Sequence, residues 1–163
     1  MAEVGVYRGD FSQYILEHCS PLHLWAIDSW AWIEARGSPG WHWPKNETAT
    51  GQEVYHEVLR KFWRVQNVTV VKSPSFLAAS LFPDDYLDWV YIDASHRYED
   101  VREDIAVWHR KVKPGGILSG HDYSNCAGVE KAVREFAASR ACEAKLTDES
   151  INSWWFTLPI DKT

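Results

Sequence analysis

Cysteine is scarce in this sequence of 163 residues and occurs three times, as Cys19, Cys126 and Cys142. An odd number of cysteines at such wide spacings excludes a disulfide framework, predicts reduced thiols and favours a cytoplasmic location. No run of about 18 apolar residues occurs, which excludes a membrane-spanning helix. The first residues, Met-Ala-Glu-Val-Gly, contain neither a basic region nor an apolar core, so no signal peptide is expected.

Basic residues are also fewer than acidic residues. Lysine and arginine number 17 against 23 aspartates and glutamates, which makes the net charge −6 and the pI about 5.6. This balance argues against nucleic acid and against an anionic membrane surface as partners. The apolar share of 45% and the chain length favour one folded domain over residues 1–163.

Tryptophan, in contrast, is abundant, with ten residues. Five of them lie within 19 positions: Trp25, Trp30, Trp32, Trp41 and Trp43. Most of these fall in residues 29–51, a stretch predicted to be a long loop. A long irregular loop in a compact domain usually serves a function. Two interpretations remain open, because the rings could form part of a binding site or could cap an exposed end of the core.

Short apolar runs alternate with helical periods along the sequence. Strands are predicted at residues 3–6, 22–27, 68–72, 88–93 and 117–120, with two more near 143–146 and 154–158. Five successive strand-then-helix units imply parallel strands joined by right-handed crossovers. No helix separates the last two strands, so the final strand is expected to be antiparallel. The predicted fold is an α/β, doubly wound, Rossmann-like sheet of seven strands.

Several polar residues are predicted to serve local structure. Two helix starts have the pattern of a capping box: Asp10 with Gln13, and Thr50 with Glu53. Pro74 is expected in the first turn of a helix, with Ser73 and Ser75 more suited to capping than to ligand contact. Acidic residues of a later helix are expected to form a solvated face: Glu99, Asp100, Glu103 and Asp104.

Ligands of a parallel sheet bind at the carboxyl ends of its strands. At the first strand end, Gly5 and Gly9 allow the backbone to approach a ligand closely. Tyr7 stands where the dinucleotide fingerprint needs a glycine, which disfavours a pyrophosphate. Glu3, just before this turn, suits an amino-bearing or cationic ligand. Asp28 ends the second strand, 19 residues after Gly9, where a carboxylate can accept both hydroxyls of a ribose. These residues together predict a nucleoside site.

Several segments carry a family resemblance: Glu3-Val-Gly-Val-Tyr-Arg-Gly9, Ala26-Ile-Asp-Ser-Trp30, Ile92-Asp-Ala-Ser-His-Arg-Tyr98, Pro114-Gly-Gly116 and Gly120-His-Asp-Tyr123. Over about residues 2–158 the sequence resembles the class I S-adenosylmethionine-dependent methyltransferases. Within them it is similar to the branch that includes the macrocin-type sugar O-methyltransferases. Members of the family usually have helices before the first strand, which cover the substrate or form a dimer interface. Here those helices are expected to be absent, and a homodimer stays an open expectation.

The resemblance implies S-adenosylmethionine as cofactor and assigns its contacts. The turn with Glu3, Gly5, Tyr7 and Gly9 is implied to contact the amino acid moiety. Asp28, followed by Ser29, is implied at the ribose. The region of Ser73 is implied at the adenine, and Asp93 is also expected to contact the cofactor.

Methyl transfer requires an oxygen aligned with the methyl group and a means of removing its proton. Asp93 and Asp122 end neighbouring strands, where two carboxylates can hold a divalent cation that lowers the pKa of an acceptor hydroxyl. His96, whose pKa is ordinarily near neutrality, can take the proton. The resemblance implies the same roles, with an acidic pair after the fifth strand. Here that pair is His121-Asp122, and imidazole favours Mn²⁺, Fe²⁺ or Zn²⁺ over Mg²⁺.

Structural roles for these residues remain open alternatives: Asp93 as a strand-end cap, His96 as a helix residue bonded to Asp93, and His121 as a loop residue. The leading hypothesis is O-methylation of a small hydroxylated metabolite such as a sugar, with a divalent metal. The alternative is a catalytically impaired S-adenosylmethionine-binding module that acts with a partner. A nicotinamide-dependent oxidoreductase is a third reading, against which Tyr7 counts.

Overall fold

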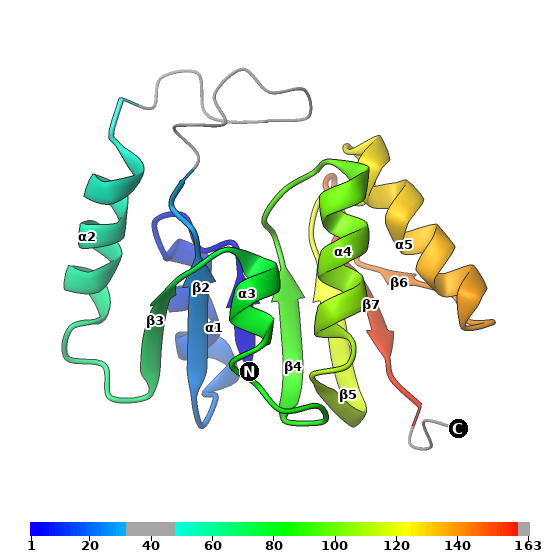
Figure 1. The fold of residues 1–163 in the computed structure, drawn as a ribbon, viewed down its shortest axis with the longest axis horizontal. Helices are drawn as coiled ribbons and strands as arrows, with labels where there is room; N and C mark the ends of the chain where they lie inside the picture. Colours follow the sequence, from blue (N-terminus) through cyan, green and yellow to red (C-terminus); the bar gives the residue numbers. More distant parts are fainter. Residues whose placement is uncertain (32–47, 160–163) are drawn as a thin grey trace.

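The structure, a computed structural model, describes residues 1–31 and 48–159. Within these ranges one sheet has seven strands in the order β3-β2-β1-β4-β5-β7-β6 (Figure 1). The strands are β1 (Ala2–Val4), β2 (Leu24–Asp28), β3 (Val68–Lys72), β4 (Leu87–Ile92), β5 (Val112–Gly120), β6 (Lys145–Leu146) and β7 (Trp154–Thr157). Strands β1 to β5 pair in parallel, and β7 is antiparallel to both β5 and β6. The predicted fold class is confirmed.

Helices cover both faces of this sheet. They are α1 (Asp10–Cys19), α2 (Gly51–Phe62), α3 (Ser75–Ala79), α4 (Tyr98–Trp108) and α5 (Ala127–Ser139). Helices α3, α4 and α5 lie on one face of the sheet (Figure 1) and contribute to one apolar cluster. Helix α2 contributes to a second cluster, against which α1 packs. Neighbouring residues of β2 divide between the two, since Ile27 belongs to the first cluster and Ala26 to the second. This division follows from the alternation of side chains along a strand.

The order of the strands creates a switch point between β1 and β4. From β1 the chain proceeds outward through β2 to β3, and it then returns to place β4 on the other side of β1. The crossovers on the two sides therefore diverge, which leaves a crevice at the carboxyl ends of β1 and β4. Gly5 and Asp93 directly follow these two strands.

One predicted capping box is confirmed and the other is wrong. Thr50 and Glu53 form both reciprocal hydrogen bonds at the start of α2. At α1 the N-cap is Gly9 in a left-handed conformation, with no side-chain cap. Asp10 instead pairs with Lys61 at 2.5 Å, because it lies inside the helix and facing α2. The sequence pattern could not distinguish N-cap from first helical residue without the backbone conformation at Gly9.

The predicted strand boundaries shift by a few residues. The second strand begins at Leu24 because Leu22 is 99% exposed and lies outside the sheet. The fifth strand begins earlier than predicted, at Val112, and pairs with Leu87 before a register shift. None of the described helices is long and apolar enough to cross a membrane.

The predicted Trp-rich loop lies mostly outside the described residues, and Trp32, Trp41 and Trp43 are not described. Trp30 is described and is buried, at 3% exposure. Its Nε1–H donates to the carbonyl oxygen of Tyr7 at 2.9 Å, and its ring lies 4.9 Å from that of Tyr55. For this tryptophan the capping interpretation holds, since it joins two strand-end loops to α2.

Candidate active site at the carboxyl edge of the sheet

A cavity of about 450 Å³ opens at the carboxyl ends of β1 to β4. Six of the predicted cofactor residues line it: Gly5, Tyr7, Asp28, Ser29, Ser73 and Asp93. They come from four different strand ends, so the fold has brought together residues that are up to 88 positions apart in the chain. Two predicted cofactor residues, Glu3 and Gly9, do not line the cavity.

Asp28 connects the loops on either side of the cavity. Its Oδ2 accepts the backbone N–H groups of Val6 at 2.9 Å and Tyr7 at 3.0 Å. Its Oδ1 accepts the N–H of Trp30 at 2.7 Å. Burial raises the pKa of Asp28, although these N–H groups oppose that shift. A carboxylate has about four lone-pair positions, and the backbone N–H of Ser29 also bonds to this carboxylate, so the loops use most of its acceptor capacity.

Gly5 is needed for packing between strand ends as well as for the cavity. Its φ is +94°, and a Cβ there would overlap the carbonyl oxygen of Asp93. Tyr7 also has a positive φ, of 51°, because its N–H turns toward Asp28. Gly9 has a different role, since its missing side chain makes room for the ring of Phe62.

Glu3 is buried beneath the cavity rather than exposed to it, with 1% of its surface accessible. Ala2 and Val4 face the α3–α5 side, so the strand alternation directs Glu3 to the opposite face. There it accepts a hydrogen bond from the hydroxyl of Ser12 in α1. Burial raises the pKa of Glu3 to about 8. A neutral, hydrogen-bonded Glu3 supports the turn from below.

At the far end of the cavity lies a buried network that the sequence analysis missed. Asp104 is 5% exposed and accepts a hydrogen bond from Ser75, which accepts one at 2.8 Å from Trp108 Nε1. Burial raises the pKa of Asp104 to about 7. The predictions of a solvated Asp104 and a capping Ser75 are therefore wrong. Position 104 lies on the same face of the helix as the buried Val101, Ile105 and Trp108. This helical spacing was the sequence signal that Asp104 is buried.

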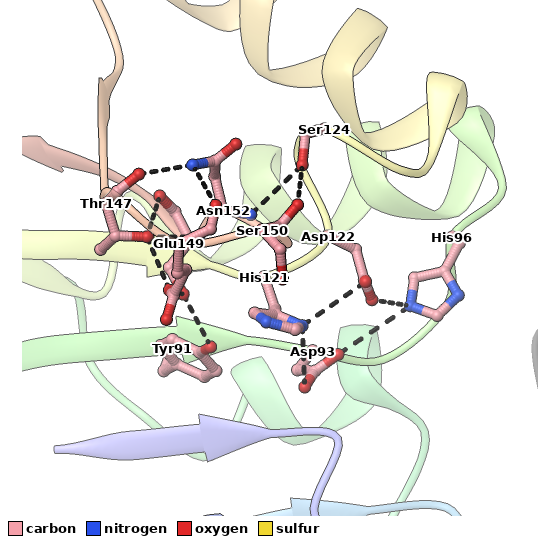
Figure 2. Close-up of polar contacts among 11 residues, drawn as sticks. Tyr91, Asp93, His96, His121, Asp122, Ser124, Thr147, Glu149, Ser150 and Asn152 are labelled. Atoms are coloured by element: carbon pink, nitrogen blue, oxygen red, sulfur yellow. Dashed lines mark hydrogen bonds and ion pairs between the residues drawn. The ribbon is translucent and has the colours of Figure 1, made fainter.

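Four residues predicted to act on the methyl acceptor form a second group beside the cavity (Figure 2). These acceptor-side residues are Asp93, His96, His121 and Asp122. His96 Nε2 lies 2.6 Å from Asp122 Oδ2 and 3.9 Å from Asp93 Oδ1. His121 Nδ1 lies 3.5 Å from Asp122 Oδ1 and 4.0 Å from Asp93 Oδ2. Asp93 also lines the cavity, and it therefore lies between the cavity and the rest of this group. The strand ends of β4 and β5 converge here as predicted.

The charges in this group are strongly coupled. Hydrogen bonds to Asp122 and then to Asp93 raise the pKa of His96 to about 9. Its value is therefore above the near-neutral one that the predicted base role assumed. Hydrogen bonds from His121 and His96 hold the pKa of Asp122 well below its usual range. Asp122 adopts a left-handed φ of 60°, which turns its carboxylate between the two imidazoles.

The loop between β6 and β7 closes one side of this group (Figure 2). Ser124, just after β5, donates to the carbonyl of Ser150 at 3.4 Å and accepts the N–H of Asn152 at 3.3 Å. Within the loop, Thr147 Oγ1 donates to Glu149 at 2.6 Å. These bonds hold a segment that is distant in sequence beside the end of β5.

Two donor sets in this region can hold a cation. The first contains Asp93, His121 and Asp122, and it is the predicted one. The second contains His96, Asp122 and Cys126, and Cys126 was not predicted. In each set the ligand atoms lie within 4.8 Å of one another. Carboxylate, imidazole and thiolate groups are ligands of divalent transition metals, so the residues fit such an ion.

Comparison with known families identifies the domain. Residues 2–123 match the model of a methyltransferase-domain family, and this segment contains the cavity and the four acceptor-side residues. The chain belongs to this methyltransferase family. It is a class I methyltransferase domain, as the resemblance implied, and its family implies S-adenosylmethionine as cofactor. No curated protein matches the chain.

Solved structures share the fold of this methyltransferase. The O-methyltransferase NovP has a TM-score of 0.69 at 20% identity, over 98% of this chain and 71% of NovP. CalS11, a TDP-rhamnose 3′-O-methyltransferase, has a TM-score of 0.63 at 14% identity, over 96% of this chain and 71% of CalS11. Spermidine synthase from Thermotoga maritima has a TM-score of 0.63 at 12% identity, over 98% of this chain. The methyltransferase spans about half, 53%, of that synthase.

Proposed function

We propose that this methyltransferase transfers a methyl group from S-adenosylmethionine to a hydroxyl of a small metabolite such as a sugar. The observation that carries the proposal is the position of Asp93, which borders both the cofactor cavity and the group of His96, His121 and Asp122. An acceptor oxygen bound at this border would lie between the cofactor and titratable side chains. NovP and CalS11 are O-methyltransferases, which supports an oxygen as the acceptor atom.

The cofactor supplies an activated methyl group on a sulfonium, which is already a good leaving group. We propose that Asp28, which lines the cavity, accepts a ribose hydroxyl in addition to the loop N–H groups that it already binds. Gly5, Tyr7 and Ser29 line the cavity around this carboxylate, and Ser73 lines it at the end of β3. Glu3 supports the turn from beneath instead of contacting the cofactor.

The acceptor proton has two proposed partners, Asp93 and His96. We assign the transfer to Asp93, because it borders the cavity, whereas His96 Nε2 is already engaged by Asp122 at 2.6 Å. The hydroxyl proton would pass to the Asp93 carboxylate as the oxygen–carbon bond forms and the sulfur–methyl bond breaks to leave S-adenosylhomocysteine, and the proton would leave from Asp93 to solvent. A divalent cation held by Asp93, His121 and Asp122 would lower the pKa of the hydroxyl.

The test uses the intact chain with two readouts. Calorimetry with S-adenosylhomocysteine measures cofactor binding, and transfer of a labelled methyl group to a panel of hydroxylated sugars measures catalysis. We expect binding and transfer for the native chain. Asp93→Asn should retain binding and lower transfer about 100-fold, as for a lost general base. Asp148→Asn, at an exposed position of the β6–β7 loop, is the matched control and should change neither.

Two outcomes decide between the hypotheses. Binding without transfer to any acceptor would favour the cofactor-binding module that acts with a partner. Full transfer by Asp93→Asn would remove Asp93 from the chemistry and return the role to His96.

A further inference from the structure

Two segments that are distant in sequence meet beside β5. His96 lies in the loop between β4 and α4, Asp122 directly follows β5, and Cys126 is the N-cap of α5. Gly128 explains how close they come, because a Cβ there would overlap the carbonyl oxygen of His96. The first turn of α5 therefore lies directly on the His96 loop. The backbone N–H of Cys126 donates to the carbonyl of Asp122 at 3.2 Å, which folds the intervening turn back over the strand end.

This packing brings three different donor groups together. The imidazole of His96, the carboxylate of Asp122 and the thiol of Cys126 offer ligand atoms that lie within 4.8 Å of one another. Their side chains are well covered: those of His96 and Asp122 are 17% and 12% exposed, and Cys126 is 5% exposed. Such a group differs from a surface cluster of carboxylates, because it contains one nitrogen, one oxygen and one sulfur donor.

Asp122 presents its two oxygens to two different donor sets. Oδ2 lies 2.6 Å from Nε2 of His96, which belongs to the set with Cys126. Oδ1 lies 3.5 Å from Nδ1 of His121, which belongs to the set with Asp93. The set with Asp93 and His121 is the more exposed of the two, with side chains 36% and 30% accessible. The set with Cys126 is the more enclosed, and its thiol is a softer metal ligand than the carboxylates and imidazole of the other set.

We propose that His96, Asp122 and Cys126 form a binding site for a thiolate-accepting divalent metal of the Zn²⁺ class. Cysteine sulfur, histidine nitrogen and aspartate oxygen are all ligands of Zn²⁺ in proteins, at about 2.3, 2.0 and 2.1 Å respectively. Mg²⁺ prefers an all-oxygen octahedral shell and is disfavoured by this set. Binding forms a metal–sulfur bond, and the thiol proton and the proton shared by His96 and Asp122 leave to solvent.

Three protein ligands leave one tetrahedral position open, which is the arrangement of catalytic rather than closed structural zinc sites. The site also joins the start of α5 to the β4–α4 loop, so a bound metal would stabilise the packing of these two segments beside the acceptor-side residues. His96 is then a ligand, which agrees with the assignment of the acceptor proton to Asp93. The inference does not depend on methyl transfer, so either proposal can fail while the other stands.

The experiment uses Co²⁺ as a spectroscopic probe for the metal. The full chain is stripped with a chelator and titrated with Co²⁺, and the near-ultraviolet thiolate-to-cobalt charge-transfer absorption is followed. We expect a saturable band of one equivalent in the native chain that Zn²⁺ abolishes and excess Mg²⁺ leaves unchanged. Cys126→Ser should abolish the band and weaken Zn²⁺ binding more than tenfold, since outer-shell changes alone cost about 10- to 100-fold.

Matched variants separate this site from its neighbour. Asp93→Asn and His121→Ala should retain the band, because they belong to the other donor set, and Cys142→Ser should retain it as the exposed-cysteine control. His96→Ala should lose the tight site while the thermal melt shows the chain still folded, which keeps the test meaningful if Cys126→Ser is unstable. Three results would overturn the proposal: no Co²⁺ binding, binding without a charge-transfer band, or a band that survives Cys126→Ser.

Discussion

Asp28 Oδ2 lies 3.0 Å from the backbone nitrogen of Tyr7 and accepts its N–H, which joins the turn after β1 to the end of β2. The carboxylate thereby holds the cavity wall in place and also lines the cavity. We expect Asp28→Ala to weaken S-adenosylhomocysteine binding by more than about tenfold, because a charge-assisted hydrogen bond is lost and the wall is loosened. Calorimetry well below the melting temperature measures this, and unchanged affinity would remove Asp28 from the cofactor site.

A second prediction concerns the close approach of Gly5 to Asp93. Gly5→Ala combines a positive φ with a backbone overlap, so we expect it to cost more than about 3 kcal/mol of unfolding free energy. Gly115→Ala is the matched control, since φ is +78° there but no atom lies within 4 Å of the added Cβ. It should cost only about 1 to 2 kcal/mol. Urea titration compares them, and equal losses would contradict the packing argument.

The buried carboxyl of Glu3 predicts a pH-dependent stability. Its pKa rises from 4.5 to about 8 on folding, so the native state keeps a proton that the unfolded chain releases. The resulting stability is fully present below about pH 4.5 and is lost as pH rises through about 8. Glu3→Gln keeps an acceptor for Ser12 and removes the titration. The unfolding free energy of the variant should rise relative to that of the native chain by up to about 1.4 kcal/mol per pH unit between pH 5 and 8.

Asp104 should act in the same direction over a narrower range, because its pKa rises from 3.8 to about 7. Asp104→Asn retains an acceptor for Ser75, so its advantage should stop growing near pH 7. The exposed Glu17→Gln provides the control for both curves. Parallel curves for Glu3→Gln and the native chain would show that Glu3 is ionised in the folded protein.

Trp30 gives a prediction about the loops beside the cavity. Trp30→Phe removes the Nε1–H that donates to the carbonyl of Tyr7 and should cost about 1 to 2 kcal/mol. Trp63→Phe changes a ring that is 77% exposed and should stay within about 0.5 kcal/mol of the native chain. Thermal melts of the two variants measure the contrast. A loss of similar size at Trp63 would mean that the hydrogen bond to Tyr7 does not stabilise the loops.

Much of the fold was predictable from periodicity. The alternation of β-branched runs with helical stripes predicted the parallel strands, and the missing helix before β7 predicted its antiparallel direction. The ends of elements were less predictable: Gly9 rather than Asp10 caps α1, because the cap depends on backbone conformation and not on residue type alone. The predicted gathering of strand-end residues held for Asp28 and Asp93, which line one cavity.

The sequence by itself determined which residues follow the strands, and parallel strands carry such residues to a common edge whatever else the chain does. Only the tertiary structure decided what each side chain does there. It directs Glu3 away from the cavity, uses most of the Asp28 carboxylate to hold loops, buries Asp104 against Ser75, and places Cys126 beside His96. The reason is physical: side-chain direction, loss of solvent and the choice of hydrogen-bond partner all depend on segments that are distant in the chain and meet only when the helices pack.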